Sequence, residues 1–276
     1  MTTAALYGSY RIMGVVNVTP DSFSDGGRFL NAEAAIAQGL ALVRDGADIL
    51  DIGGESTRPG ADEVPADEEH ARVIPVLEGL CAETDAALSI DTRKPEIAVD
   101  AVAAGASIWN DVSALTYSRD SLRVAADLAC DIVLMHAQGD PKTMQDDPHY
   151  DDVVEQVYGF LADRIDTCKR AGIDPSRLIV DPGIGFGKTL EHNLALIANL
   201  TRFCEMGRPV LLGASRKRFI SALDREGPAD QRLGGSLAAA LAGFQGGAGI
   251  FRVHDVAATR QALSVAAAIH NALEKP

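Results

Sequence analysis

Apolar positions along this chain follow two patterns that alternate with each other. Short apolar runs rich in β-branched residues lead, through a turn, into longer stretches in which apolar residues recur every three or four positions. One such stretch has Ile36, Leu40 and Val43 on a single face. It starts at Asn31, a good N-cap, and stops at Gly46, a residue that commonly ends helices. This pattern predicts an amphipathic helix over residues 31–46.

Two further stretches follow the same rule. Residues 152–171 carry an apolar stripe made by Val154, Val157, Leu161 and Cys168. Pro95, a residue favoured in the first turn of a helix, opens another helical stretch, and Gly105 closes it. Helices therefore alternate with the short apolar runs along the chain.

Eight short apolar runs read as strands, and each ends on a polar residue. These residues are Asn17, Asp51, Asp91, Asn110, His136, Asp181, Ser215 and His254. Continuously apolar strands that alternate with amphipathic helices indicate a parallel sheet covered by helices. Eight such units in 276 residues, without a linker or low-complexity stretch, predict one α/β domain, a (β/α)8 TIM barrel over residues 1–276. The rival is a doubly wound fold, which has fewer strands and a glycine fingerprint after the first.

The polar strand ends predict where chemistry takes place. Active sites of such barrels are built at the carboxyl ends of the strands. A single polar end is more simply a turn residue or a helix cap, but eight of eight favour a functional mouth. The side chains expected to ring it are Asn17, Asp51, Asp91, Asn110, Asp181 and His254.

Charge and cysteine usage restrict the partners and the compartment. The formal net charge of −14 argues against nucleic acid and anionic membranes, which bind basic surfaces. The N-terminal residues lack a signal-peptide pattern, and no apolar run approaches 18 residues. The four cysteines are widely separated, as in free thiols. We therefore expect a soluble, cytoplasmic protein that binds anions through a local cationic pocket.

The last two strand ends predict that pocket. Arg216 and Lys217 follow the seventh strand, and Arg252 and His254 lie at the end of the eighth. Loops after the seventh and eighth strands of barrels commonly bind phosphate. Lys217 also precedes a short helical stretch, residues 218–224, whose first amides favour an anion.

The segment NVTPDSFSDGG, residues 17–27, has the composition of an ordinary flexible loop, and it also suits a mobile cover. It places the carboxylates of Asp21 and Asp25 around Phe23. Asn17 offers an amide oxygen, a hard ligand for Mg²⁺ alongside the phosphates of a substrate. We therefore predict Asn17 as a metal ligand.

The segment GGESTRPG, residues 53–60, reads about equally well as a glycine-rich turn with a solvated arginine and as a binding loop. Ser56 and Thr57 bring hydroxyl groups. Arg58 brings a guanidinium fork that can meet a phosphate or carboxylate bidentately.

The strand ends in the middle of the chain suggest recognition of a ring. Asp91 and Asp181 are expected on opposite sides of the mouth, with Asn110 nearby. Carboxylates pair with a guanidine-like N–C–N edge, such as that of a pterin, as they pair with arginine. For Met135 and His136 a core or cap role is as plausible as ligand binding.

In this order and spacing, the motifs closely resemble those of the dihydropteroate synthase family. The segments are MGVVNVTPDSFSDGG, DIGGESTRPG, SIDT, WND, LMH, DPGIGFGKT, GASRK and FRVHD, and together they span roughly residues 11–256. The first two segments are the most specific. Arg218 departs from the pattern, because many members have serine there, near the carboxylate of the second substrate.

The resemblance implies an enzyme, a transferase of folate biosynthesis that condenses a dihydropterin methyl diphosphate with 4-aminobenzoate. It implies that Asp91, Asp181 and Lys217 carry the catalysis, with Asn110 on the pterin and with Met135 and Phe186 beside its ring. The diphosphate is expected on Asn17 with Mg²⁺, on Thr57, and on Arg252 and His254. The 4-aminobenzoate pocket, the target of sulfonamides, is expected to be completed by Phe23, Arg58 and Pro59. Relatives also suggest a homodimer formed through helices opposite the site.

Two other functions are weighed against this one. A pterin-dependent methyltransferase would share the barrel and its carboxylates but would need no diphosphate site. A non-catalytic paralogue would be expected to have lost one of the motif positions. The intact segments NVTPDSFSDGG, SRK and RVH argue against both alternatives.

Overall fold

The computed structural model describes residues 10–18, 28–56, 63–139 and 143–273, and this part of the chain forms a barrel of eight parallel strands. The strands are β1 (Arg11–Asn17), β2 (Ile49–Gly53), β3 (Ala87–Asp91), β4 (Ile108–Asp111), β5 (Asp131–Met135), β6 (Leu178–Asp181), β7 (Leu211–Leu212) and β8 (Ile250–Val253). Their spatial order is β6-β5-β4-β3-β2-β1-β8-β7, and a parallel bridge between Val180 and Val210 links the two ends of this order. The predicted fold class is confirmed.

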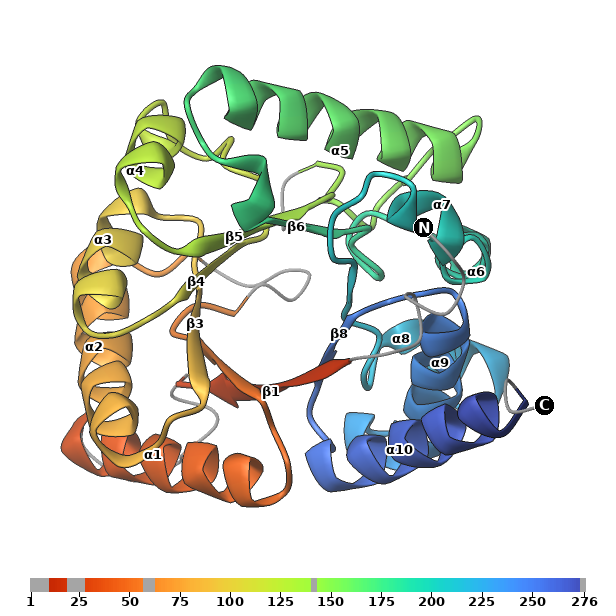
Figure 1. Ribbon diagram of the computed structural model, residues 1–276, viewed down its shortest axis with the longest axis horizontal. Coiled ribbons are helices and arrows are strands. Elements are labelled where there is room, and N and C mark those ends of the chain that lie inside the picture. Colours follow the sequence, from red (N-terminus) through yellow and green to blue (C-terminus); the bar gives the residue numbers. More distant parts are fainter. Residues whose placement is uncertain (1–9, 19–27, 57–62, 140–142, 274–276) are drawn as a thin grey trace.

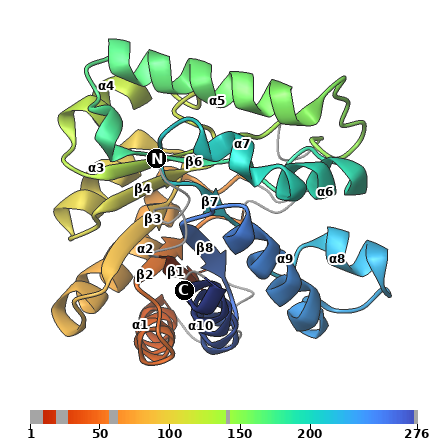
Figure 2. The ribbon, with the colours of Figure 1, turned by 45° about the vertical axis from the view of Figure 1, so that its right-hand side comes forward.

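Helices surround the strands on the outside (Figure 1). They are α1 (Arg28–Arg44), α2 (Ala66–Glu83), α3 (Pro95–Ala103), α4 (Ser121–Asp127), α5 (Val153–Arg170), α6 (Leu190–Ala198), α7 (Leu200–Cys204), α8 (Arg218–Leu223), α9 (Leu233–Gln245) and α10 (Val256–Leu273), with short 3-10 turns at η3 (Pro175–Arg177) and η4 (Ala229–Arg232). Figure 2 shows α8 and α9 next to each other at one edge of the molecule. In the described part of the chain, no helix combines the length and the apolar content needed to cross a membrane.

Side chains on each strand alternate between the inside of the barrel and the helix-facing side. The inside contains one buried apolar layer, formed by Met13, Ile49, Ile108, Val133, Ile179, Leu211 and Ile250. The outward residues between them, such as Leu50 and Phe251, belong to the larger core beneath the helices. Two positions further along the strands, the inward residues include Asp51, Ser89, Asn110, Asp181 and Arg252. The period of two therefore stacks a polar layer on an apolar one, at the carboxyl ends of the strands.

The helix predictions hold with small corrections at the amino ends. The prediction of Asn31 as an N-cap is wrong, because α1 already begins at Arg28 and no residue between them disfavours a helix. Asp152 caps α5 by accepting from two backbone amides, and Val153, rather than Val154, starts its buried stripe. Helix α3 begins at Pro95 as predicted. Gly105 follows it with a φ of 108°, a backbone conformation that favours glycine.

Candidate active site

The floor of the barrel mouth is organised around the carboxylate of Asp51, two positions along β2 from Ile49. Asp51 is fully buried, and it accepts hydrogen bonds from Ser89 Oγ (2.6 Å), Asn110 Nδ2 (3.1 Å) and Arg252 Nε (2.6 Å). A buried carboxylate requires such partners, and these contacts fix the orientation of Asn110 and Arg252. Asp51 therefore supports the site from below, where a ligand does not reach it.

Asp91, at the end of β3, has one carboxylate oxygen engaged and one open. Arg252 Nη2 donates to Oδ2 at 2.7 Å. Oδ1 is buried and has no hydrogen-bond partner among the described residues. Burial raises the pKa of Asp91 to about 7, with Arg252 opposing the shift and Asp51 adding to it. Since an unpaired buried acceptor costs about 1–3 kcal/mol, Oδ1 is suited to accept a hydrogen bond from a ligand.

Asp181 lies at the end of β6, three strands away from Asp91 around the barrel. Its Oδ1 accepts from the backbone amide of Gly183 at 2.7 Å. A Cβ atom placed on Gly213 would lie 3.9 Å from Asp181 Oδ2, from Lys217 Nζ and from Arg252 Cβ. Three charged residues thus surround one glycine, which leaves room for a flat ring. Burial raises the pKa of Asp181, and Lys217 opposes that shift.

Lys217 reaches the mouth from the turn after β7 and contacts the loop after β6. Its Nζ donates to the carbonyl oxygen of Ile184 and lies 4.5 Å from the centre of the Phe186 ring. Burial lowers the pKa of Lys217 to about 8, against the effect of the Asp181 carboxylate. The structure therefore brings Lys217 together with Asp181 and Phe186, as the sequence predicts.

His254 and Ser215 lie side by side at the ends of β8 and β7. Ser215 Oγ accepts from the backbone amide of His254 at 3.2 Å and lies 3.1 Å from His254 Nδ1. Ser215 thereby orients the imidazole of His254 on the side of the mouth formed by β7 and β8.

Arg216 does not join the predicted cationic cluster. Its φ is 59°, and its guanidinium forms a bidentate pair with Asp255 through Nε (2.9 Å) and Nη2 (2.5 Å). Part of Arg252 is likewise engaged, by Asp51 and Asp91. Arg218, the departure from the family pattern, is an exposed side chain at the start of α8. Of the four residues predicted for the cationic cluster, the structure therefore places Lys217, Arg252 and His254 at the mouth.

The two loops after β1 and β2 are described in part. Asn17 is half-buried at the end of β1, where Val18 N donates to Gly53 O at 2.8 Å. Asp21, Phe23, Asp25, Thr57, Arg58 and Pro59 lie outside the described residues. Their roles stay predictions.

His136 and Lys188 form a buried pair beside the mouth. His136 packs edge-on against Phe160 at 4.9 Å, and its Nδ1 lies 3.0 Å from Lys188 Nζ, so the core role applies to it. Met135 is also buried. Lys188, which is 3% exposed, is not among the site residues predicted from the sequence. The sequence feature that points to it is its position within DPGIGFGKT, a few residues after a polar strand end.

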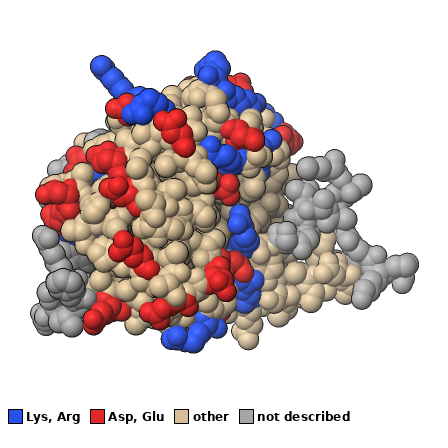
Figure 3. All heavy atoms as spheres, turned by 60° about the vertical axis from the view of Figure 1, so that its left-hand side comes forward, with Lys and Arg blue, Asp and Glu red and all other residues tan. Residues whose placement is uncertain are grey.

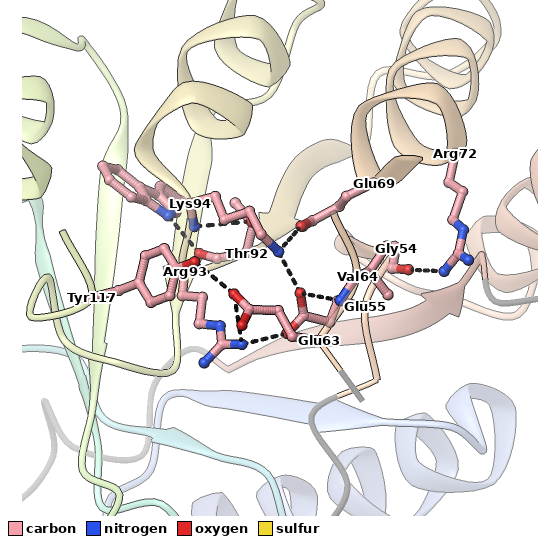
Figure 4. A network of polar contacts seen from close by, with 11 residues as sticks. Gly54, Glu55, Glu63, Val64, Glu69, Arg72, Thr92, Arg93, Lys94 and Tyr117 are labelled. Atoms are coloured by element: carbon pink, nitrogen blue, oxygen red, sulfur yellow. Dashed lines mark hydrogen bonds and ion pairs between the residues drawn. The ribbon is translucent and has the colours of Figure 1, made fainter. Parts of the chain in front are cut away.

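A network of buried charges lies next to the mouth, between the loops after β2 and β3 (Figure 4). Lys94 Nζ donates to Glu69 Oε2 (2.6 Å) and to Glu55 Oε2. Arg93 Nη2 lies 2.9 Å from Glu55 Oε1 and 3.4 Å from Glu63 Oε1. Lys94 is 4% and Glu69 0% exposed at the side chain, so this ion-pair network is largely shielded from water.

Glu55 holds both ends of the segment that carries Thr57 and Arg58. Its Oε2 accepts from the backbone amide of Val64 at 3.4 Å, while its own backbone lies two residues after the end of β2. Arg72 Nη1 adds a hydrogen bond to the carbonyl oxygen of Gly54 at 2.7 Å. The described residues on either side of 57–62 are thereby tied to each other and to the residues that follow Asp91.

Charged side chains of both signs lie on the outer surface. On the face shown in Figure 3, Asp and Glu side chains are interspersed with Lys and Arg. With a net charge of −14, attraction of an anion depends on the positive groups within the mouth.

A family model described as pterin binding enzyme matches residues 13–254. The chain is 48% identical over 263 residues to dihydropteroate synthase of Haemophilus influenzae, covering 95% of this chain and 94% of that protein. It is 51% identical to dihydropteroate synthase of Neisseria meningitidis serogroup B, covering 92% and 91%.

Solved structures show the same similarity. Dihydropteroate synthase of Xanthomonas albilineans with 4-aminobenzoic acid superimposes with a TM-score of 0.90 at 53% identity, covering 98% of this chain and 95% of that one. The complex of the Xanthomonas enzyme with 7,8-dihydropteroate gives a TM-score of 0.87 at 50% identity, covering 98% and 96%. Dihydropteroate synthase of Yersinia pestis, solved with a sulfonamide drug, gives 0.91 at 42% identity, covering 96% of each chain.

Proposed function

This chain belongs to the pterin-binding enzyme family and has dihydropteroate synthase activity, and we propose that the residues gathered at its barrel mouth carry out that condensation. The enzyme is a transferase. It joins (7,8-dihydropterin-6-yl)methyl diphosphate to 4-aminobenzoate and releases 7,8-dihydropteroate and diphosphate, a reaction of folate biosynthesis.

The observation that carries the proposal for the site is the open acceptor on Asp91. Its buried Oδ1 faces no partner among the described residues, and Asp181 stands on the far side of the mouth. Two carboxylates match the N–H donors of a pterin, with Asn110 beside them and Lys217 completing the ring site. Gly213 leaves the space that a flat ring needs.

The diphosphate is bound on the side of β1 and β8. Arg252 donates from Nε to Asp51 and from Nη2 to Asp91. The other side of its guanidinium then donates to the phosphate oxygens. His254, oriented by Ser215 at the end of β8, is the second contact to the phosphate oxygens. Thr57 adds a hydroxyl donor from the loop after β2.

Magnesium fits this side of the site as an ion bound together with the substrate. Among the described residues there is no group of three or more His, Cys, Asp or Glu that could hold a metal. Mg²⁺ typically uses one or two protein oxygens together with substrate phosphates and water, and the amide oxygen of Asn17 supplies one. The bound ion would neutralise charge that develops on the leaving diphosphate.

The substitution takes place at the exocyclic methylene of the pterin. As the C–O bond to diphosphate breaks, the dihydropterin delocalises positive charge, so the path is SN1-like. Asp91 and Asp181 stabilise that cation, while Arg252, His254 and Lys217 stabilise the leaving group. The amine of 4-aminobenzoate then forms the C–N bond and loses a proton. This route requires no covalent nucleophile.

Release of diphosphate distinguishes this activity from its alternatives. We expect release that depends on 4-aminobenzoate and gives dihydropteroate in equal amount. A pterin-dependent methyltransferase or a non-catalytic binding protein would release none. Asp181→Ala should abolish pterin binding, whereas Asp163→Ala, an exposed change on α5, should not. Unchanged affinity in Asp181→Ala would place the pterin elsewhere.

A homodimer is part of the proposal. Apolar side chains are exposed on helices α6, α9 and α10, at Leu194 (39%), Leu233 (37%), Val265 (54%) and Ile269 (60%). A cavity of about 580 Å³ between α6, α8 and α9 opens beside Leu194 and Leu223. Such surface is typical of subunit contacts. Analytical ultracentrifugation of the wild type and of Ile269→Asp tests it, and a wild-type monomer would contradict it.

A cytoplasmic location is also proposed. All four cysteines, Cys81, Cys130, Cys168 and Cys204, are free thiols in the structure. Free thiols suit a reducing compartment. Fractionation of cells, with detection of the protein by antibody, tests this location.

A further inference from the structure

Lys188 joins the end of β5 to the loop after β6 from a buried position. Its Nζ donates to Phe186 O at 2.9 Å, and it lies 3.0 Å from His136 Nδ1 and 3.3 Å from His136 O. The residue is 3% exposed. An ammonium group in such surroundings is retained only where acceptors replace its water. Here an imidazole and two carbonyl groups do so.

The loop between Asp181 and Lys188 packs its backbone against the segment that follows β5. Gly183 has a φ of 70°, and a Cβ atom there would collide with the carbonyl oxygen of His136. Gly187 has a φ of 61°, and a Cβ atom there would lie 2.6 Å from the carbonyl oxygen of Gln138. Both positions exclude a side chain, and the ammonium group of Lys188 fills the polar centre of this contact.

The opposite side of the same loop contacts Lys217. Ile184 O accepts from Lys217 Nζ, and the Phe186 ring lies 4.5 Å from it. A Cβ atom placed on Gly185 would lie 3.0 Å from Lys217 Cδ. Any shift of the loop therefore moves the surface on which Lys217 rests.

We propose that Lys188 is a positioning residue of this enzyme, which holds the loop after β6 against His136 so that Ile184 and Phe186 keep Lys217 in the pterin site. The inference rests on the proposed placement of the pterin at Lys217 and Asp181. Lys188 itself acts through the loop and touches no substrate.

The charges around the pair are consistent with this role. Burial lowers the pKa of His136 to about 3, with Lys188 adding to the shift, so the imidazole is neutral and its Nδ1 can accept a hydrogen bond from the ammonium group. Burial also lowers the pKa of Lys188 to about 7, with Asp181 opposing and Lys217 adding, so the ammonium form predominates below that pH. Tyr150, whose pKa burial raises to about 12, faces the loop as a neutral donor to Gly187 O. The pKa of His192, on α6, is lowered, by burial first and also by Lys188.

Affinity for 6-hydroxymethylpterin tests the proposal, because a pterin without diphosphate reports on the ring site alone. Calorimetric titration measures the dissociation constant together with the number of binding-competent sites. We expect Lys188→Met to raise the dissociation constant about tenfold, the effect of losing about one charged hydrogen bond, with a stoichiometry near one. Lys188→Gln, which keeps a donor without charge, should fall between Lys188→Met and the wild type. Lys169→Met, at an exposed lysine of α5, is the matched control and should bind as the wild type does.

The double variant separates positioning from a second, independent contribution. If Lys188 acts through Lys217, then Lys188→Met should change affinity less than twofold in a Lys217→Met background. If the fold-changes of Lys188→Met and Lys217→Met multiply in the double variant, the two residues act independently and the proposal is overturned. An unchanged dissociation constant in Lys188→Met and Lys188→Gln would also overturn it. This holds even if the stoichiometry falls, because a lower stoichiometry shows only that part of the protein is unfolded, while the folded part binds the pterin normally. Failure of the wild type to bind the pterin would instead contradict the proposed function.

Discussion

Charged side chains in the mouth differ in how much of their bonding capacity the protein itself uses. Asp51 is fully buried, and its carboxylate accepts hydrogen bonds from Ser89, Asn110 and Arg252. Asp91 pairs one oxygen with Arg252 and keeps the other open. At the scale of single residues, this difference separates the residues that support the site from those that can meet a ligand.

Lys217→Ala should lower the rate on the order of 10²-fold, because it removes a preorganised charged contact in the pterin site. The fold should survive, since Lys217 lies in a turn and outside the apolar core. Steady-state rates and thermal unfolding measure the two effects, with Lys169→Ala as the control on an exposed helix face. Near-normal turnover of the folded variant would defeat the assignment.

Pterin binding to the free enzyme should weaken as the pH falls below about 7. The raised pKa of Asp91 means that the carboxylate is protonated below that value, and it then ceases to be a charged acceptor. The dissociation constant of 6-hydroxymethylpterin, measured between pH 5.5 and 8.5, checks this, and Asp91→Asn should bind weakly with a flatter profile. A wild-type affinity that does not change over this range would contradict it.

At the scale of elements, the loops after β2 and β3 are connected by charge. Glu55 contacts Arg93, Lys94 and the amide of Val64, and Lys94 also reaches Glu69 at the start of α2 (Figure 4). Tyr117, after β4, donates to Glu63 at 2.7 Å. The network thus connects the loops that follow three neighbouring strands beside the mouth.

Glu55→Gln should raise KM for 4-aminobenzoate several-fold and lower stability on the order of 2 kcal/mol. It removes a charged acceptor from the buried Lys94 and the half-buried Arg93, and it loosens both ends of the segment that carries Thr57 and Arg58. Affinity for 6-hydroxymethylpterin should change little. Initial rates at varied 4-aminobenzoate and denaturant unfolding measure these effects. Glu68→Gln, at a half-exposed partner of Arg72, is the control. Equal changes in both variants would argue against a specific role for Glu55.

At the scale of the whole molecule, the proposed mechanism brings the two substrates together at one end of the barrel. The proposed pterin site consists mainly of strand ends packed above the apolar layer of Met13, Ile49 and their neighbours. The second substrate is predicted to bind through two segments rich in glycine and polar residues, 17–27 and 53–60. Coupling between the two subsites is therefore expected.

4-Aminobenzoate should bind weakly to the free enzyme and well once Mg²⁺ and diphosphate are present. Ordering a loop residue costs about 1–2 kcal/mol, which is more than one small ligand can offset over a whole segment. Diphosphate with Mg²⁺ can supply that energy through Asn17, Asp21, Thr57 and Arg58. Calorimetric titration with and without Mg²⁺-diphosphate measures the difference. Equal affinities would mean that the pocket is preformed.

The barrel and its polar strand ends follow from patterns within the sequence. Apolar runs of strand length and helical stripes depend on local spacing, so eight βα units could be read without tertiary contacts. The motifs then identified the family, and with it the roles expected for Asp91, Asp181 and Lys217. The start of α1 was misplaced, because a cap-like residue such as Asn31 is also tolerated inside a helix.

How these polar residues pair depends on contacts between distant parts of the chain. Arg216 and Arg252 look alike in the sequence, yet one is bound by Asp255 outside the cluster and the other reaches Asp51 and Asp91, 201 and 161 positions away. The pairing of Lys188 could not be read from local sequence either, because its partner His136 lies 52 positions earlier. Local patterns set which side of a strand or helix a residue occupies. Which charges neutralise one another, and which are left for a ligand, is settled when distant strands close into a barrel.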